Sequence, residues 1–381
     1  MNTDQLSPRD LTNQKAAIFR NLLTQSGFKL LMALLCIYFF FVFALGLQQV
    51  VKTKQANQEL LSKLEAEGIP ERERLQDSRL EDPWHKGLQA SQRFVSSRNL
   101  ETIARQTTIV GMAALGMTLV IISAGIDLSV GSIVALGTVV IAWLLNKNGF
   151  SPLLAAILAV AACGTCGFIS GILITNLRVV PFIVTLGMML FIRGAAKGLS
   201  NEQKIDAPDT WLNELLASLG QDQKWMLIPS GVWILIIMAV MVAVLLRYTR
   251  LGRHIFAIGS NEQTARLCGV AVVRVKVIIY SLCGVFAGLA GLMQFSRLTV
   301  GDPTVAIGLE LDVIAAVVIG GGSLAGGEGS ILGSLIGALI LTVIASGCSQ
   351  MGLPNWVQEI ITGAIIIVAV ALDRLRHRRP T

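Results

Sequence analysis

The chain has 381 residues, of which 53% are hydrophobic and only 14% are charged. This is more apolar surface than a single soluble core can bury, so the composition indicates a polytopic membrane protein. The net charge of +7 is spread over short segments between apolar runs. That distribution is typical of cytoplasmic loops and excludes the clustered basic surface of a nucleic-acid-binding protein.

The N-terminal part of the chain divides into three segments. Residues 1–27 are polar and basic, which predicts a cytoplasmic segment, and residues 28–47 form a first transmembrane helix that is too long for a signal peptide. Residues 48–99 mix acids and bases almost equally and are expected outside the cytoplasm. Two interpretations of this insertion stay open. It is either a flexible charged linker, or a continuation of the first helix to residue 67 that packs on the protein's own outer loops or on a partner outside the membrane.

The membrane core is expected from residue 100 to residue 372. With the first helix, its apolar runs predict an all-α fold of about ten transmembrane helices, some of them discontinuous. The further runs are 107–126, 130–145, 153–175, 182–192, 228–246, 277–295, 313–327, 331–346 and 360–372. The run 182–192 is too short for a full crossing and is predicted to be a half helix. An even number of crossings places both termini, the basic loop 247–276 and the basic tail 373–381 in the cytoplasm.

Two glycine-containing breaks interrupt the apolar runs. At the first, Gly125 is predicted to end one helix in the left-handed conformation, and Asp127 or Ser129 to cap the next, which places Asp127 at a membrane face. The second, residues 319–331, is rich in glycine and predicts irregular backbone at membrane depth, where it must be buried or line a path. Both breaks are followed by Gly-Ser-Ile, at 131–133 and 329–331, which suggests an internal repeat of two halves.

A short capped helix is predicted within the basic loop. Asn261 has the side chain of an N-cap, Glu262 lies near the positive end of the helix, and Gly269 is a stop. A rigid helix outside the bilayer can transmit the movement of a partner. The alternative is an ordinary solvated loop helix.

Signatures of catalysis are absent from the sequence. There is no phosphate-binding Gly-x-x-x-x-Gly-Lys-Ser/Thr loop, and the three histidines are far apart, so we expect no enzyme activity, no metal site and no cofactor bound by this chain. The acids Asp127, Glu310, Asp312 and Glu328 either form a proton or sodium relay, as in a secondary transporter, or serve as caps and interface charges.

Four ordered motifs resemble one family. They are Gly-Ile-Asp-Leu-Ser-Val-Gly at 125–131, Val-Pro-Phe-Ile-Val-Thr-Leu-Gly at 180–187, the stretch from Gly252 to Gly269, and Glu-Leu-Asp-Val at 310–313 with the glycine-rich run after it. Over roughly residues 94–372 the chain resembles the membrane permeases of ribose/xylose-type ABC sugar importers. The long charged insertion 48–99 departs from the family pattern, so the resemblance says nothing of its role.

The resemblance implies a permease subunit of the bacterial cytoplasmic (inner) membrane that translocates a monosaccharide. Its expected partners are a separate ABC ATPase, an extracytoplasmic sugar-binding protein, membrane lipid, and a second permease copy in a homodimer or heterodimer; nucleic acid is not expected. The residues expected to couple to the ATPase are Asn261, Glu262, Thr264, Ala265, Arg266 and Gly269. Those expected to line or gate the pathway are Asp127, Ser129, Phe182, Thr185, Gly320, Gly321, Gly322, Ser323, Gly326 and Gly327. The alternatives are an ion-coupled secondary carrier of small polar solutes and a membrane scaffold or receptor without transport.

Overall fold

The computed structural model describes residues 26–218 and 228–377, and within them the chain forms fourteen α-helices. The predicted N-terminal segment up to residue 25 and the last four residues of the tail lie outside this part. The helices are α2 (Ser26–Ala66), α3 (Glu71–Arg74), α4 (Pro83–Val95), α5 (Ser97–Ile122), α6 (Val130–Asn148), α7 (Pro152–Leu177), α8 (Pro181–Ser200), α9 (Ser230–Tyr248), α10 (Arg250–Ser260), α11 (Glu262–Leu267), α12 (Val272–Leu298), α13 (Leu309–Ile319), α14 (Ile331–Gln350) and α15 (Asn355–His377). A 3₁₀ turn, η1 (Trp211–Glu214), and two strands, β1 (Ile205–Asp206) and β2 (Val300–Gly301), complete the described elements.

The helices make this a multi-pass membrane protein. Seven of the described helices, namely α2, α5, α7, α8, α9, α12 and α14, are long and apolar enough to cross a bilayer. Two shorter apolar helices lie within α6 and α15, and α13 has only 11 residues. Together they agree with the predicted all-α fold of about ten transmembrane helices, some discontinuous.

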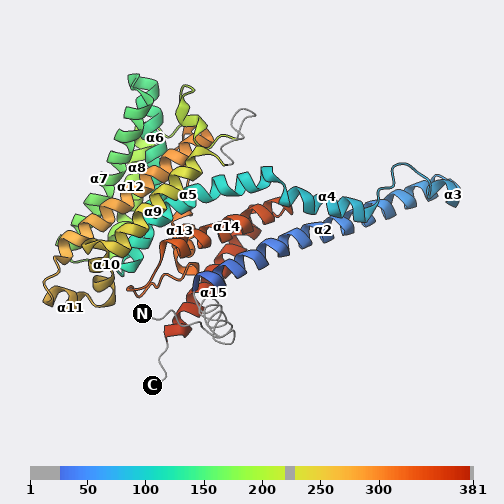
Figure 1. Ribbon diagram of the computed structural model, residues 1–381. Coiled ribbons are helices and arrows are strands. Elements are labelled where there is room, and N and C mark those ends of the chain that lie inside the picture. The colour runs from blue at the N-terminus through green and yellow to red at the C-terminus, as the bar shows by residue number, and fades with distance from the viewer. Residues whose placement is uncertain (1–25, 219–227, 378–381) are drawn as a thin grey trace, which may run out of the picture.

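Helix α12 is at the centre of the bundle, where it packs against α5, α6 and α7 (Figure 1). Small residues make the contact with α7 close. A Cβ atom on Gly284 would lie 2.5 Å from the carbonyl oxygen of Cys163, so a larger residue would force the two backbones apart. Cys163 is a free, fully buried cysteine. It therefore serves helix packing, as small residues do between transmembrane helices.

The bundle has two distinct ends. At one end α10 and α11 form a short helical connection between α9 and α12, and we refer to it as the α11 end (Figure 1). At the other end β1 and β2 pair in antiparallel register, with Ile205 opposite Gly301. The side-chain amide of Asn146, near the end of α6, donates to the carbonyl oxygen of Asp206 at 2.7 Å. These contacts join the ends of α6, α8 and α12.

A helical hairpin is formed by α2, α3 and α4 (residues 26–95); the inner half of α2 packs on α14, and the outer part of the hairpin extends away from the bundle (Figure 1). Helix α2 has 41 residues, so it is about 60 Å long, roughly twice the thickness of a bilayer core. The predicted flexible linker is therefore wrong, and the alternative of one continuous helix is confirmed. The apolar residues of its outer half pack on the returning chain, where Leu64 is buried.

Helix α4 returns along α2 in close contact. A Cβ atom on Gly87 would lie 2.7 Å from the carbonyl oxygen of Gly46, and the Ser91 hydroxyl donates to the Val42 carbonyl oxygen at 2.8 Å. Nearer the tip, the side chain of Asn57 donates to the Glu81 carbonyl oxygen at 2.8 Å. The hairpin is thus a defined two-helix structure.

Two predicted spans differ from the structure. The run at 182–192 is not a half helix, because α8 continues to Ser200 and has 20 residues. It passes through Arg193, a charged residue that in the sequence suggested the end of the span. The Arg193 guanidinium donates hydrogen bonds to the carbonyl oxygens of Pro303 and Val305 at 2.9 and 2.6 Å, so it has partners within the protein. The run at 313–327 is too long, since α13 ends at Ile319 and the glycine-rich residues form a non-helical connection to α14.

Candidate functional site

The predicted helix in the basic loop is present as α11. The Asn261 side chain accepts a hydrogen bond from the Thr264 backbone N–H at 2.8 Å, which makes it the N-cap. Gly269 has a φ of +83° and ends the turn after the helix. Ala265 is buried against the bundle, whereas Thr264 and Arg266 are exposed. The six residues predicted to couple to the ATPase therefore lie together on one protruding element.

Glu262 has a role that the sequence did not indicate. Its carboxylate forms an ion pair with Arg266 at 3.3 Å, and another with Lys276 of α12 at 2.7 Å. The second pair fixes α11 to the bundle. Leu267, in contrast, is 88% exposed and has no such internal role. Reversing the charge of Glu262 would therefore disturb the position of α11 as well as its surface.

The first predicted break, between α5 and α6, differs from the expectation in its details. The residue in the left-handed conformation is Ala124, with a φ of +59°, and not Gly125. Gly125 is required for space, because a Cβ atom there would lie 2.5 Å from the Tyr280 hydroxyl. Ser129 is the N-cap residue of α6 but makes no side-chain cap bond.

Asp127 and Ser129 bond to each other and are both fully buried. The Asp127 carboxylate oxygen Oδ1 accepts hydrogen bonds from the Ser129 backbone N–H at 2.9 Å and from its hydroxyl at 2.6 Å. Asp127 therefore bonds to the N-cap residue of α6 and not to the N–H groups of the helix itself, contrary to the expected capping. Its contacts stabilise the turn itself.

The glycine-rich connection after α13 lies against this turn. The Gly327 backbone N–H donates to the carbonyl oxygen of Ile122 at 2.8 Å. A Cβ atom on Gly326 would lie 2.7 Å from both the Ala124 Cβ and the Gly259 carbonyl oxygen, and Gly259 belongs to α10. The connection is thus held between the α5–α6 turn and the helix that precedes α11. Gly320, Gly322 and Ser323 are buried within it, and Gly321 and Gly327 are half-buried.

The predicted pathway residues of α8 are divided. Thr185 is buried, and its hydroxyl donates to the Ile126 carbonyl oxygen at 3.3 Å, so it joins the same cluster. Phe182 is 46% exposed at the start of α8. The structure therefore brings most of the predicted pathway residues together at the α11 end, beside the predicted coupling element.

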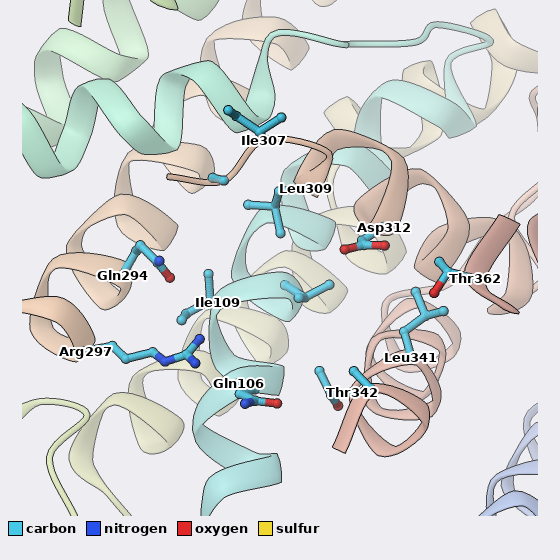
Figure 2. Close-up of a pocket in the computed structure, with 13 residues that line it drawn as sticks. Gln106, Ile109, Gln294, Arg297, Ile307, Leu309, Asp312, Leu341, Thr342 and Thr362 are labelled. Atoms are coloured by element: carbon cyan, nitrogen blue, oxygen red, sulfur yellow. The ribbon is translucent and has the colours of Figure 1, made fainter. Parts of the chain in front are cut away.

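A cavity in the bundle lies elsewhere, and Asp312 is the one residue of its lining that the sequence had singled out. It has a volume of about 370 Å³, within the usual range of about 300–1,000 Å³ for small-molecule sites. Figure 2 shows Gln106 and Ile109 of α5, Gln294 and Arg297 of α12, Asp312 of α13, and Thr362 of α15 around it. Thr342 of α14 also lines it and shares a hydrogen bond of 2.6 Å with Thr107. We refer to it as the central cavity.

The polar groups of the central cavity suit a neutral, hydrogen-bonding solute. Arg297 only donates hydrogen bonds, the Asp312 carboxylate only accepts them, and the amides of Gln106 and Gln294 do both. Within residues 26–218 and 228–377, neither Arg297 nor Asp312 forms an ion pair. Their hydrogen-bonding capacity is therefore free for a ligand. Apolar residues such as Ile109 and Leu341 form the rest of the wall.

The four acids considered as a relay do not form one group. Glu310 and Asp312 both lie in the first turn of α13, and Asp312 lines the central cavity. Asp127 is enclosed in the α5–α6 turn, and Glu328 is exposed in the glycine-rich connection. In the part of the chain that the structure describes, no group of three or more His, Cys, Asp or Glu side chains is arranged to hold a metal ion.

Residues 99–370 match the family described as "Branched-chain amino acid transport system / permease component". The ribose import permease protein RbsC of Escherichia coli (strain K12) is 41% identical over 75% of this chain and 89% of its own length. The fructose import permease protein FrcC of Rhizobium meliloti is 37% identical over 74% of this chain and 79% of its length. The L-arabinose ABC transporter permease protein AraH of Azospirillum brasilense is 36% identical over 75% and 83%.

No solved structure gives a significant match to the chain. The family match begins at residue 99, just after the start of α5, so the hairpin lies outside it. Within the match lie α11, the α5–α6 turn, the glycine-rich connection and the central cavity. The chain therefore belongs to this family of transport-system permeases, as a multi-pass ABC transporter subunit that is not itself catalytic.

Proposed function

We propose that this permease imports a monosaccharide and that the central cavity is where the sugar passes. The relatives reported above are named for ribose, fructose and L-arabinose. The observation that carries the proposal is the set of free polar groups around the cavity, with Arg297 on one side and Asp312 on another. A sugar offers hydroxyl groups that both donate and accept, so it can bond to each of them without introducing a charge.

The partners follow from the same function. A separate ABC ATPase supplies the energy, an extracytoplasmic binding protein delivers the sugar, and a second copy of the permease completes the pathway. The N- and C-termini and α11 lie in the cytoplasm, and the hairpin lies outside. The basic residues Arg247, Arg250, Arg253 and Arg266 near α11 support this orientation by the positive-inside rule. Labelling of a Ser78→Cys variant tests it, because this exposed position should react only from the extracytoplasmic side.

Coupling runs from α11 through α10 to the glycine-rich connection. The ATPase binds the exposed surface of α11, and Gly259 of α10 touches Gly326 directly. A movement of α10 therefore reaches both the connection and the α5–α6 turn. Residues such as Asp127, Ser129 and Gly327 act in this proposal as a gate at the α11 end, while the central cavity holds the sugar.

Uptake of radiolabelled D-ribose, D-fructose and L-arabinose into proteoliposomes that contain the permease, its ATPase and its binding protein tests the proposal. We expect ATP-dependent uptake of at least one sugar, unaffected by ionophores that collapse ion gradients. Arg297→Met and Asp312→Asn should each reduce this uptake at least tenfold. A tenfold loss corresponds to about 1.4 kcal/mol, close to what one hydrogen bond to a charged group contributes. Glu359→Gln, an exposed position of α15, is the control.

The outcomes separate the alternatives. Uptake that needs an ion gradient and no ATP would establish the secondary carrier instead. ATP-dependent uptake that both cavity variants retain would place the sugar path outside the central cavity. For coupling, Leu267→Asp should abolish uptake and ATPase binding without disturbing the ion pairs of Glu262, whereas normal binding by this variant would contradict the role of α11.

A further inference from the structure

A second polar pocket lies between α6, α8 and the segment that precedes α13. Its volume is about 220 Å³. It is lined by Ser132, Met189, Leu190, Arg193, Lys197, Thr304, Ile307 and Glu310. Of these residues only Ile307 also lines the central cavity.

Two buried polar atoms of residues that line this pocket have no hydrogen-bond partner among the residues that the structure describes. One is the hydroxyl of Ser132, a residue with no exposed surface, and the other is the carboxylate oxygen Oε2 of Glu310. The other oxygen of Glu310, Oε1, accepts a hydrogen bond from the Gly308 N–H at 3.2 Å. Burying a polar atom without a partner costs about 1–3 kcal/mol, and most such atoms in native proteins are paired. Two such atoms on residues that line one pocket point to a ligand that bonds to both.

The charges restrict what this ligand is. Arg193 and Lys197 are positive and would repel a metal ion, whereas Glu310 would repel an anion. The guanidinium and ammonium groups donate hydrogen bonds, the carboxylate accepts them, and the Ser132 hydroxyl does both. A neutral solute with several hydroxyl groups matches this combination.

The second pocket adjoins the central cavity. Ile307 lines both, and its side chain is 76% exposed. Residues 302–309 therefore form a wall between the two spaces, with Ile307 at its edge. Arg193 holds this wall through its hydrogen bonds to Pro303 and Val305. Ile307 is therefore the side chain that the two spaces share.

We propose that the second pocket is a second binding position for the same polyhydroxyl substrate, separated from the central cavity by Ile307. This inference rests on the proposed function as a sugar permease. The sugar bonds to Ser132 and Glu310 in one position and to Arg297 and Asp312 in the other, and the Ile307 side chain moves aside between them.

Cysteine protection tests the two positions separately. The full-length permease in nanodiscs, with its ATPase, carries either Ser132→Cys or Gln106→Cys in a background where the exposed Cys36 and Cys268 are serine and Cys166 is alanine. Modification by N-ethylmaleimide, a neutral reagent, is timed with and without the sugar that the wild-type protein transports. Glycine betaine at equal osmolarity is the solute control, and Ser78→Cys on the hairpin is the site control. Thr304→Cys, on the exposed rim of the second pocket, is a further probe if Ser132→Cys does not fold.

We expect the sugar to slow modification of both pocket cysteines at least fivefold and to leave Ser78→Cys unchanged. Protection at Gln106→Cys alone would overturn the second position and leave the proposed function intact. If the sugar protects neither cysteine, it binds in neither space, and both the second position and the proposed path through the central cavity are wrong. Pocket cysteines at 132 and 304 that never react would show a pocket closed to solutes and would also overturn the inference.

The separating role of Ile307 has its own measurement. Ile307→Trp should lower the maximal uptake rate at least tenfold while the sugar still protects Gln106→Cys, because binding in the central cavity remains and transfer is blocked. Leu311→Trp, which adds similar bulk at an exposed position of α13 outside both pockets, should transport at close to the wild-type rate. Equal rates for the two variants would exclude Ile307 as the barrier.

Discussion

The helical hairpin and the bundle core bury their residues to very different extents. In α5, every residue from 111 to 122 is buried, whereas in the outer half of α2, from 51 to 66, only Thr53 and Leu64 are. The core residues are fixed by neighbours on all sides, so a change in one moves several helices. The outer half of α2 is fixed only by the returning chain of the hairpin, so we expect the core to fold without it. The family match includes the core and not the hairpin, which agrees with a separate role for the hairpin.

The largest effect is expected where the core is tightest, at the glycine-rich connection. Gly326 and Gly321 have nearly equal φ values, +87° and +88°, so valine at either position pays the cost of the left-handed conformation, about 1–2 kcal/mol or more. At Gly326 the new Cβ would also collide with Ala124 and Gly259, whereas at Gly321 it would meet nothing within 4 Å. We expect Gly326→Val to abolish ATP-driven uptake and Gly321→Val to retain part of it.

Thermal unfolding of the two purified variants accompanies the uptake assay and shows whether each is folded. Equal uptake by the two variants would mean that the contact with α10 is unimportant. Normal uptake by both would make these glycines ordinary packing residues and contradict a gate in this region.

The sequence predicted the features that depend on local pattern. Apolar length predicted the number of spans, and the spacing of Asn261, Glu262 and Gly269 predicted α11, because a cap acts within a few residues of the chain. The predicted span 182–192 is shorter than the helix in the structure, because the charge of Arg193 in the sequence indicates the end of an apolar run. Its partners, the carbonyl oxygens of Pro303 and Val305, are more than a hundred residues away.

The central cavity escaped prediction for the same reason. Gln106, Arg297 and Asp312 belong to three helices, and each alone resembles a residue near the end of a span. Only the packing of α5, α12 and α13 brings them to one space. The predicted pathway residues were chosen from the glycine breaks and a family motif. Those residues lie at the α11 end of the bundle and not around the central cavity. Whether they gate the pathway stays a prediction.

An intermediate effect is expected from separating the two helices of the hairpin. Valine at Gly87 would place its Cβ 2.6 Å from the Val50 methyl group and 2.7 Å from the Gly46 carbonyl oxygen. We expect Gly87→Val to push α4 off α2 while the core stays folded. A disulfide between Asn57→Cys and Glu81→Cys, which are in contact in the wild type, reports the hairpin directly.

Crosslinking should fall at least threefold in Gly87→Val, while uptake at a saturating concentration of binding protein stays within twofold of the wild type. Leu88→Val, at an exposed neighbouring position, is the control and should crosslink normally. A loss of ATPase binding or of thermal stability in Gly87→Val would show that the core depends on the hairpin after all.

The smallest effect on the folded core is expected from removing the outer hairpin altogether. On α4, Trp84, Leu88 and Val95 are 65%, 62% and 46% exposed, and their spacing places them on one face of the helix. Such a face outside the membrane favours contact with a protein partner, and the binding protein is the partner expected on that side.

Replacing residues 52–90 with a short Gly/Ser linker should therefore raise the binding-protein concentration needed for half-maximal uptake about three- to tenfold, since tenfold corresponds to about 1.4 kcal/mol. The maximal rate and ATPase binding should change little, because α11 is at the other end of the bundle (Figure 1). The double variant Trp84→Ser and Leu88→Ser should reproduce most of the shift with the hairpin intact, and Lys52→Ser and Gln58→Ser, which alter exposed polar residues of α2, should not. An unchanged concentration dependence in the deletion and in the Trp84 and Leu88 variant would leave the hairpin as a spacer without a docking role.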